Sequence, residues 1–419
     1  QDHRPHGGTG ALRPERLLTA TGLRGGLLGV FVLGLGFSIT LSQSALAALT
    51  LLWLWRLRDP AVRASQTWPL LGPLCAFASA TLLSAALSDQ LGASLLASKG
   101  LLLAAALWVT ADVVAGGEEA QRFLSGLALV AAAAASMGLI QVVTCPGEPS
   151  APGLLRWFFH RCDRARGAFS IYMTLAGVLN LVLLATLPRL LAGERRRWLA
   201  WAWLAMLLGL GATYTRGAWM GFAAGVVGVV AAVRRARLLA AAALLLVAAV
   251  ALLAPGPLSH RLRTMGDPEE AGIKERLYMW QSGMRMWAEQ PWLGVGPGGV
   301  KRRYAEFALP EAFKKRTGHV HSTPLQILVE RGVLGLAAWL WIWVAFFLRA
   351  AGLRRARPRD DDPGRALVLG SMGAAVGFLG AGLSEYNFGD SEVALVMWAL
   401  MALPFAAARP APDTRAGAR

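Results

Sequence analysis

The sequence predicts an all-α, polytopic membrane protein that crosses the bilayer with about twelve helices. Hydrophobic residues make up 55% of the chain and charged residues only 16%, and the mean hydropathy is +0.46. Soluble globular domains contain about 25% charged residues, so this composition excludes most soluble enzymes and binding modules. Long runs without a charged side chain recur from one end of the chain to the other, which is the pattern of membrane-spanning helices.

The formal net charge of +17 would indicate nucleic-acid binding in a soluble protein. In this chain the excess comes from arginines that flank the apolar runs. We therefore expect membrane lipids, and no nucleic acid, as partners.

The expected spans follow the apolar runs. Their centres lie near residues 30, 48, 78, 105, 133, 178, 205, 225, 246, 340, 375 and 400. The fourth span is the weakest because Lys99 and Asp112 leave only 100–111 free of charge, but a lysine near a span end can reach the interface. Residues 25–47 resemble a cleavable secretion signal, yet apolar sequence resumes immediately afterwards, so we expect two short uncleaved spans. Because the chain begins with Gln1, we expect a trimmed or altered start.

The positive-inside rule orients these spans. Every second loop, counted from the amino-terminal arm, belongs to a set in which most loops have an excess of arginine. Placing this set in the cytoplasm leaves the other loops external and both termini inside. The expected parts are a cytoplasmic arm (1–24), transmembrane helices 1–9 (25–254), a periplasmic loop with amphipathic helices (255–323), transmembrane helices 10–12 (324–408) and a cytoplasmic tail (409–419).

The long loop between spans nine and ten is large enough for structure of its own. A helix is expected to start with Asp267 as its cap and Glu270 closing a capping pair, and to stop at Pro291. Its apolar stripe comprises Ile273, Leu277, Trp280, Met284 and Trp287, which we expect to pack on the bilayer surface or on the bundle. The glycine-rich residues 294–299 suit a hinge better than an anion-binding loop, and a second short helix is expected over 300–308.

Three cysteines exclude a disulfide scaffold and a multi-cysteine metal site. Cys75 lies in an apolar span and is expected to be buried. Cys145 and Cys162 share one external loop, and the sequence allows either a disulfide between them or two free thiols.

External loops contain more arginine than the orientation rule favours. Residues 144–167, 213–217 and 255–323 all carry arginine where it opposes translocation. A guanidinium group stays charged and binds phosphate oxygens in pairs, so anion binding is the simplest functional interpretation. For most of these arginines, contact with outer lipid headgroups is the more ordinary role, and both interpretations remain open.

Few external side chains can perform acid–base chemistry. His319 and His321 stand at the mouth of the tenth span, and a His-x-His pair without a nearby carboxylate is weak evidence for metal, so no metal site is expected. External carboxylates that could hold a divalent metal or act as a base are sparse, and the candidates are Asp89, Glu385, Asp390 and Glu392. Glu330 and Arg331 can form an ion pair inside the tenth span.

Four patches resemble the O-antigen ligase family and the related O-antigen polymerases. They are RARGAF at 164–169, TYTRGAW at 213–219, ERLYMW at 275–280 followed by QPWLGVGPG at 290–298, and HSTPLQILVERGVLG at 321–335. Each patch is loose by itself, but the four occur in order at the family's topological positions. Ser322 stands where many members have Asn. The motifs span residues 160–340, and the span number and single large external loop extend the resemblance to the whole chain.

The resemblance implies a glycosyltransferase of GT-C-like architecture in the bacterial inner membrane, with its active site facing the periplasm. Its donor would be an O-antigen glycan on undecaprenyl pyrophosphate, and its acceptor a sugar hydroxyl of lipid A–core oligosaccharide. It also implies no metal, nucleotide sugar or other cofactor. Direct displacement by the hydroxyl would invert the anomeric configuration.

By this resemblance the catalytic residues are Arg216, Arg276 and His321. The two guanidinium groups would bind the pyrophosphate and stabilise the charge that develops on the leaving oxygen. His321 would take the proton of the incoming hydroxyl. The expected substrate-binding residues are Arg164, Arg166, His319 and Arg285. The sequence does not say which of the first two contacts substrate.

Three other functions compete with the ligase. An O-antigen polymerase would use the same lipid-linked donor with a second lipid-linked glycan as acceptor. A twelve-helix transporter is more remote, because transporters usually show paired halves and no such repeat is visible. A passive scaffold would tolerate alanine at Arg216, Arg276 and His321.

Overall fold

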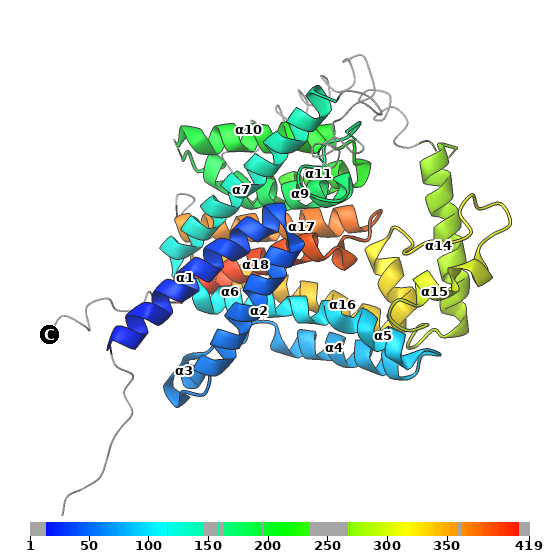
Figure 1. Cartoon of the computed structure of the whole chain (residues 1–419), viewed down its shortest axis with the longest axis horizontal. Helices are drawn as coiled ribbons and strands as arrows, with labels where there is room; N and C mark the ends of the chain where they lie inside the picture. The colour runs from blue at the N-terminus through cyan, green and yellow to red at the C-terminus, as the bar shows by residue number, and fades with distance from the viewer. Residues whose placement is uncertain are drawn as a thin grey trace, which may run out of the picture.

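The computed structural model describes residues 14–409, apart from 115, 146–157, 159–161, 195, 234–266, 268 and 358–361. All regular elements in these residues are helices (Figure 1). In chain order they are α1 (Pro14–Phe37), α2 (Ile39–Arg56), α3 (Pro60–Ser65), α4 (Leu71–Ala86), α5 (Leu91–Ala97), η1 (Ser98–Ala104), α6 (Ala105–Val113), α7 (Gly117–Val143), α9 (Tyr172–Leu191), α10 (Arg197–Ala212), α11 (Arg216–Ala232), α14 (Ala271–Glu289), α15 (Gly299–Phe307), α16 (Thr323–Arg355), α17 (Pro363–Gly382), η4 (Asn387–Gly389) and α18 (Ser391–Ala406).

The positions of the expected spans agree with these helices. The ninth expected centre, near residue 246, lies outside the described residues, as do parts of the expected arm, loop and tail. Every other expected centre falls within a helix.

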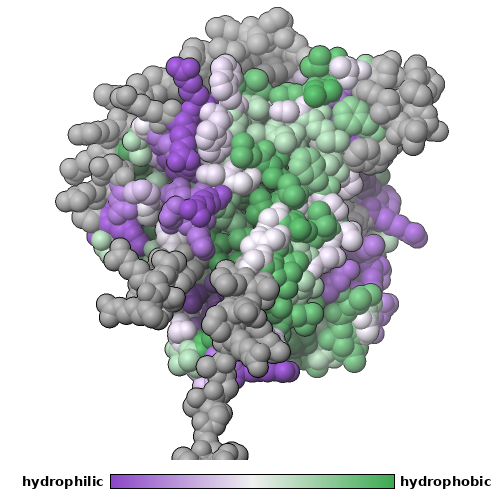
Figure 2. All heavy atoms as spheres, turned by 60° about the vertical axis from the view of Figure 1, so that its left-hand side comes forward, coloured by the Kyte–Doolittle hydropathy of each residue, from purple (hydrophilic) through white to green (hydrophobic). Residues whose placement is uncertain are grey.

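The described helices form a membrane protein. Five are long and apolar enough to cross a bilayer: the continuous run Leu91–Val113, α7, α9, α16 and α17. Five shorter apolar helices accompany them. Large apolar side chains such as Leu102, Trp201 and Leu348 point outward, and Figure 2 shows a broad hydrophobic surface bordered by hydrophilic residues. A surface of this kind suits lipid better than water. The total of twelve spans stays a prediction.

Charged residues that lie in or just after four helices meet at one end of the bundle, around Asp112. The Asp112 carboxylate contacts Arg24 at 2.9 Å, Arg56 at 2.7 Å and Arg409 at 3.7 Å. These contacts bring the C-terminal ends of α2, α6 and α18 to the middle of α1, at what we call the opposite end of the bundle. The helices α14 and α15 lie at the other end, on the right in Figure 1, which we call the loop end. The three arginine contacts of Asp112 also explain how the weak fourth span accommodates this acidic residue.

Small residues bring α11 and α17 into backbone contact. A Cβ added at Gly221 would lie 2.4 Å from the carbonyl oxygen of Gly377, and one at Gly225 would lie 2.8 Å from that of Gly373. Membrane helices associate closely where small residues line the interface. This glycine seam fixes the start of α11 beside the segment that follows α17, and both contribute to the site described below.

A break in α16 anchors the loop helices. Gly332 adopts a φ of +63°, and a Cβ there would lie 2.2 Å from the backbone of Trp292. Val295 and Gly296 donate backbone hydrogen bonds to the carbonyls of Val329 and Glu330, both at 3.0 Å. The glycine-rich segment does connect α14 with α15, as expected of a hinge, but it is fastened along the start of α16. The expected Glu330–Arg331 pair is present at 3.1 Å.

The predicted start of the loop helix is wrong by three residues. The N-cap of α14 is Glu270, whose carboxylate accepts from the backbone N–H groups of Gly272 and Ile273, both at 3.1 Å. Asp267 instead accepts from the N–H of Glu269 in the preceding turn. The helix ends at Glu289, next to the predicted stop at Pro291.

The predicted apolar stripe of this helix packs on the protein only in part: Trp280 and Trp287 are half-buried against Met279 and Met286, and contact of the stripe with the bilayer surface stays a prediction. Leu277 and Met284 are exposed. The buried residues of α14 are Glu275, Met279, Ser282, Gly283 and Met286. Polar residues are buried here because they have partners: the Glu275 carboxylate accepts from the backbone N–H groups of Phe313 and Lys314 at 2.8 and 2.9 Å.

The cysteines divide into a bonded pair and a surface thiol. Cys145 and Cys162 form a disulfide, which decides the open alternative. Cys75 is exposed, so its predicted burial is wrong. Its helix, α4, packs on α16 through its other face, and a membrane-facing surface is as apolar as a core, so apolar sequence cannot distinguish the two.

Candidate active site

A cavity of about 450 Å³ opens at the loop end of the bundle. Its walls come from the start of α9 and the segment before it, the turn before α11 and its first residue, α14, the segment before α16, and Glu385 after α17. The charged residues and the histidine that line it are Arg164, Arg216, Glu270, Glu275, Arg276, Lys314, His321 and Glu385. We call it the arginine cavity. It unites all three residues expected to be catalytic.

Arg216 is the first residue of α11 and follows a sharp turn. Tyr214 in that turn has a φ of +51°, and Trp219 donates from Nε1 to the carbonyl of Leu210 at 3.0 Å, which ties the turn to α10. The guanidinium is 12% exposed and contacts the Glu270 carboxylate at 3.1 Å. The same carboxylate caps α14, so this contact links α11 to the loop helix.

Arg276, Glu385 and His321 form a connected row. The Arg276 Nη2 donates to Glu385 Oε1 at 2.7 Å, and the second oxygen of this carboxylate lies 3.5 Å from His321 Nδ1. The latter distance is in ion-pair range without being a hydrogen bond. Thr323 donates its hydroxyl to the backbone carbonyl of Glu385 at 2.9 Å, which fixes this residue beside the start of α16. One carboxylate therefore contacts both an arginine and an imidazole.

His321 is held in an uncommon backbone conformation. Its φ is +50°, which costs free energy for a residue with a side chain. The neighbouring Val320 is fastened on both sides: Trp280 Nε1 donates to its carbonyl at 3.0 Å, and its N–H donates to Gln326 Oε1 at 2.9 Å. These bonds hold the strained segment and direct the imidazole into the arginine cavity.

His319 packs against His321 but faces a different space. The two ring centroids are 4.2 Å apart. Burial, followed by the proximity of His321, lowers the pKa of His319 to about 4. His319 is therefore neutral near pH 7.

His319 lines a second cavity of about 280 Å³, which we call the side cavity. It lies between α9, α11, α17 and the segment before α18. Its polar lining residues are Asn180, Thr215, His319, Glu385, Tyr386, Asn387 and Asp390. Met173, Thr215 and Glu385 line both cavities, so the two spaces share one wall.

The remaining expected substrate-binding residues differ in their placement. Arg164 lines the arginine cavity, with its guanidinium 4.4 Å from the centroid of the Tyr172 ring. Arg166 is buried and donates to the carbonyl of Phe169 at 2.9 Å, so it holds the loop backbone. Arg285 lies on an exposed face of α14 and is not part of the cavity lining. The geometry therefore favours Arg164 over Arg166.

Sequence reasoning missed the roles of two carboxylates. The sequence indicates Glu270 only as part of a helix start, and Glu385 only as one of four external carboxylates that could hold a metal or act as a base. A usable signal existed for Glu385, because it lies in the turn between the last two spans, on the same predicted side as the arginine-rich loops. For Glu270, the cap and the arginine contact use the same carboxylate, and the sequence pattern reveals only the cap.

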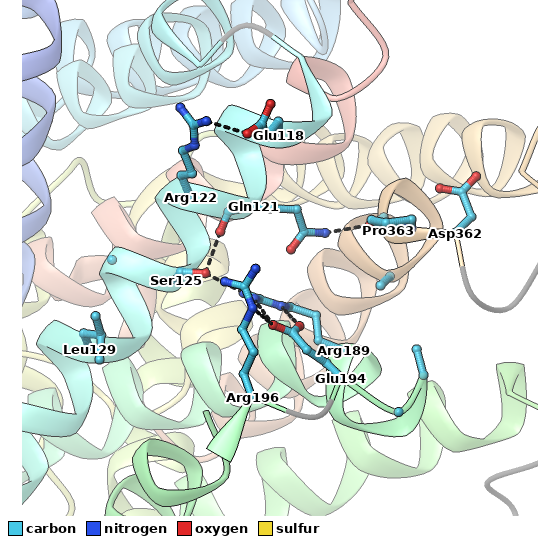
Figure 3. A pocket seen from close by; sticks show the side chains of 14 residues that line it. Glu118, Gln121, Arg122, Ser125, Leu129, Arg189, Glu194, Arg196, Asp362 and Pro363 are labelled. Carbon is cyan, nitrogen blue, oxygen red and sulfur yellow. Dashed lines mark hydrogen bonds and ion pairs between the residues drawn. The ribbon is translucent and has the colours of Figure 1, made fainter. Parts of the chain in front are cut away.

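A third and larger cavity, of about 680 Å³, lies at the opposite end between α7, α9 and α17 (Figure 3). Arg189 is 5% exposed there and donates to both oxygens of Glu194, at 2.7 and 2.9 Å, and to the hydroxyl of Ser125 at 2.9 Å. Arg196 contacts the same carboxylate at 3.4 Å. This opposite-end cavity contains none of the expected catalytic residues.

Comparison with known proteins finds a family match for the central part of the chain. Residues 201–340 match the family model described as O-antigen ligase. The match runs from α10 into α16 and includes Arg216, Arg276 and His321, whereas Arg164 and Glu385 lie outside it. No curated protein matches the chain. Through this region, which is about a third of its length, the chain is similar to the O-antigen ligase family.

Proposed function

We propose that the protein is a ligase-type glycosyltransferase that moves O-antigen glycan from undecaprenyl pyrophosphate to a sugar hydroxyl of lipid A–core. The observation that carries this proposal is that Arg216, Arg276 and His321 line one cavity, together with Arg164 and Lys314. Such a space offers permanent positive charge for a diphosphate next to a residue that can accept a proton. The match of residues 201–340 to the O-antigen ligase family model supports the general reaction, and the cavity supports the assignment of its parts.

The arginines would act on the leaving group. As the bond between the anomeric carbon and the pyrophosphate oxygen breaks, negative charge grows on that oxygen, and fixed guanidinium groups stabilise it without reorganising. Arg216 and Arg276 each contact a carboxylate in the structure. An incoming diphosphate would compete with Glu270 and Glu385 for these contacts, so the carboxylates keep both arginines in position before the donor binds.

His321 would act on the acceptor. The acceptor oxygen attacks the anomeric carbon, its proton moves to the imidazole, and the lipid pyrophosphate leaves. This single displacement inverts the anomeric configuration, which NMR of the product linkage checks. Glu385 would orient the imidazole by accepting from Nδ1, which leaves Nε2 as the base. The 3.5 Å separation would have to shorten when substrate binds, as catalytic hydrogen bonds of empty sites often do.

The loop end is proposed to face the periplasm of a bacterial inner membrane, as the arginine distribution predicts. The Cys145–Cys162 disulfide supports this orientation, because disulfides persist on the oxidising side. The divisions of the chain at residues 24, 254, 323 and 408 are part of the same proposal.

The test is an in vitro transfer reaction with a lipid-linked glycan and purified lipid A–core, run with and without a chelator. His321→Ala should lower kcat by about 10²–10⁴-fold, the range for a lost general base, while the chelator should have no effect. Full activity of His321→Ala would contradict the assignment. Glycan growth without attachment to lipid A would identify a polymerase with the same donor instead.

A further inference from the structure

The side cavity is adjacent to the arginine cavity and differs from it in charge. The arginine cavity is lined by three arginines and a lysine against three glutamates, so its lining carries an excess of positive charge. Among the residues that line the side cavity there is no lysine or arginine, and two of them, Glu385 and Asp390, are acidic. A phosphate group is attracted to the first space and repelled from the second. An occupant of the side cavity should therefore be uncharged or cationic.

Two buried polar atoms of the side cavity lack a hydrogen-bond partner in the described structure. Asn180 is 1% exposed; its Nδ2 donates to the carbonyl of Gly377 at 3.3 Å, and its Oδ1 is unpartnered. Nδ1 of the neutral His319 is also unpartnered. Buried polar atoms are almost always paired, so exceptions call for an explanation. A ligand that carries hydroxyl groups could pair with both atoms, because a hydroxyl donates and accepts.

The rest of the lining fits a ring with one apolar face. Phe378 and Tyr386 contribute aromatic surface, and Asn387 and Asp390 contribute further polar groups. A hydrocarbon chain would leave Asn180 and His319 unpaired. The volume of about 280 Å³ lies just below the range of about 300–1,000 Å³ that larger ligands occupy, so the space suits a single sugar unit better than an oligosaccharide.

The position of the side cavity fits the reaction. Its shared wall contains Thr215 and Glu385, and the two histidines stand on either side of that wall with their rings 4.2 Å apart. A sugar in the side cavity would present its anomeric bond or a hydroxyl toward His321 and the arginines.

We propose that the side cavity is a saccharide-binding subsite, in which Asn180 and His319 hydrogen-bond to the hydroxyl groups of the sugar unit nearest the reacting bond. This inference rests on the proposed function and adds the location at which a sugar is recognised. The sugar belongs either to the donor, directly after the pyrophosphate, or to the end of the acceptor. Both sources have the same chemistry, and the experiment below distinguishes them.

The experiment compares Asn180→Ala and Asn180→Leu with the wild-type full-length chain in detergent or nanodiscs. Three quantities are measured: KM for the lipid-linked glycan, KM for lipid A–core, and the Kd of geranylgeranyl pyrophosphate, a probe without sugar. One of the two KM values should rise about tenfold, which corresponds to the loss of about one hydrogen bond, while the Kd of the probe stays within about twofold. A rise for the donor assigns the subsite to the donor's first sugar, and a rise for lipid A–core assigns it to the acceptor.

The matched control is Thr186→Val on the same helix, α9. Thr186 is fully buried, donates its hydroxyl to the carbonyl of Val182 within its own helix, and lines neither cavity. It should leave all three quantities unchanged. Two unchanged KM values for the Asn180 variants, or an equal weakening of probe binding, would overturn the proposal.

A measurement on the wild type covers the case in which the Asn180 variants do not fold. Free monosaccharides of the donor and acceptor glycans are tested by saturation-transfer NMR in the presence of saturating geranylgeranyl pyrophosphate. Binding together with the probe is expected, and the absence of any saccharide binding contradicts the subsite. If the wild type binds saccharide but transfers no glycan, the proposed function fails and the subsite stands.

Discussion

The arginine cavity and the opposite-end cavity contain similar residues in different arrangements. In the opposite-end cavity, Arg189 is nearly inaccessible and engages both oxygens of Glu194 as well as Ser125 (Figure 3). In the arginine cavity, Arg216 and Arg276 reach two different carboxylates from different helices, and a histidine stands beside them. The larger volume belongs to the opposite-end cavity. Size and arginine content therefore do not identify the site.

What separates the two cavities is how readily their ion pairs can be exchanged. Glu194 lies five residues after Arg189, so this pair closes the turn between α9 and α10 and has a structural role. The carboxylates of the arginine cavity connect α11, α14 and the segment after α17, which are distant in the chain. Contacts between separate elements can be replaced by a bridging ligand, and this difference predicts opposite responses to matched substitutions.

The largest contrast is expected between two arginines. Arg276→Ala should lower kcat/KM by about 10²–10³-fold, the usual cost of removing one group that stabilises transition-state charge. Arg196→Ala, which removes a comparably charged side chain from the opposite-end cavity, should stay within about twofold of wild type. Both are measured in the lipid A–core transfer assay. Equal losses in the two variants would mean that the cavities do not differ in function.

A smaller contrast is expected between two glutamates. Glu385→Gln should lower kcat about tenfold with little change in KM, because an amide placed toward His321 Nδ1 donates where the carboxylate accepts. Glu385→Asp, which keeps the charge, should restore part of the loss.

Glu194→Gln supplies the matched control. Arg189 lowers the pKa of Glu194 by hydrogen bonding to its ionised form, so the substitution should reduce Tm while leaving kcat unchanged. If Glu385 had a purely structural role, Glu385→Gln would show the same pattern as this control: a reduced Tm and an unchanged kcat in the folded fraction.

The smallest effect concerns pH and stability. The pKa of His319 in the folded chain is about 4, below its ordinary value of 6.5, so between these values the unfolded chain binds more protons. Stability contributed by neutral His319 is therefore present above pH 6.5, falls as the pH drops toward 4 and levels off below it. His319→Asn should show a shallower fall of Tm over this window. Parallel Tm curves for the two proteins would indicate that His319 is not buried as the structure describes.

The fold was predictable where apolar runs determine it, and less so where packing does. Helix positions followed from runs without charge, because the bilayer requires them. The face that a helix buries did not follow: Cys75 is outside and Glu275 is inside. In lipid the outer surface is also apolar, and a polar residue is buried when tertiary contacts satisfy it, as the backbone around Phe313 does for Glu275.

The candidate site was predictable in its cations and not in its anions. Arg216, Arg276 and His321 were indicated by arginines that oppose the orientation rule and by the family motifs. Choosing between Arg164 and Arg166 requires the directions of their side chains, and two arginines this close in one loop give no sequence pattern that reveals those directions. Glu385 follows α17 and is brought to His321 by the packing of α16 and α17, so the sequence indicates its side of the membrane but not its contact with His321.

The glycine seam between α11 and α17 gives the arginine cavity walls of unequal stiffness. Backbones in direct contact cannot slide or separate without losing their close fit, so the wall that carries Arg216 and Glu385 should behave as one body. The facing wall, α14, meets it chiefly through exchangeable ion pairs from Glu270 and Arg276. Entry of a lipid diphosphate would then exchange the ion pairs of Glu270 and Arg276 while the rest of α14 stays packed on α16.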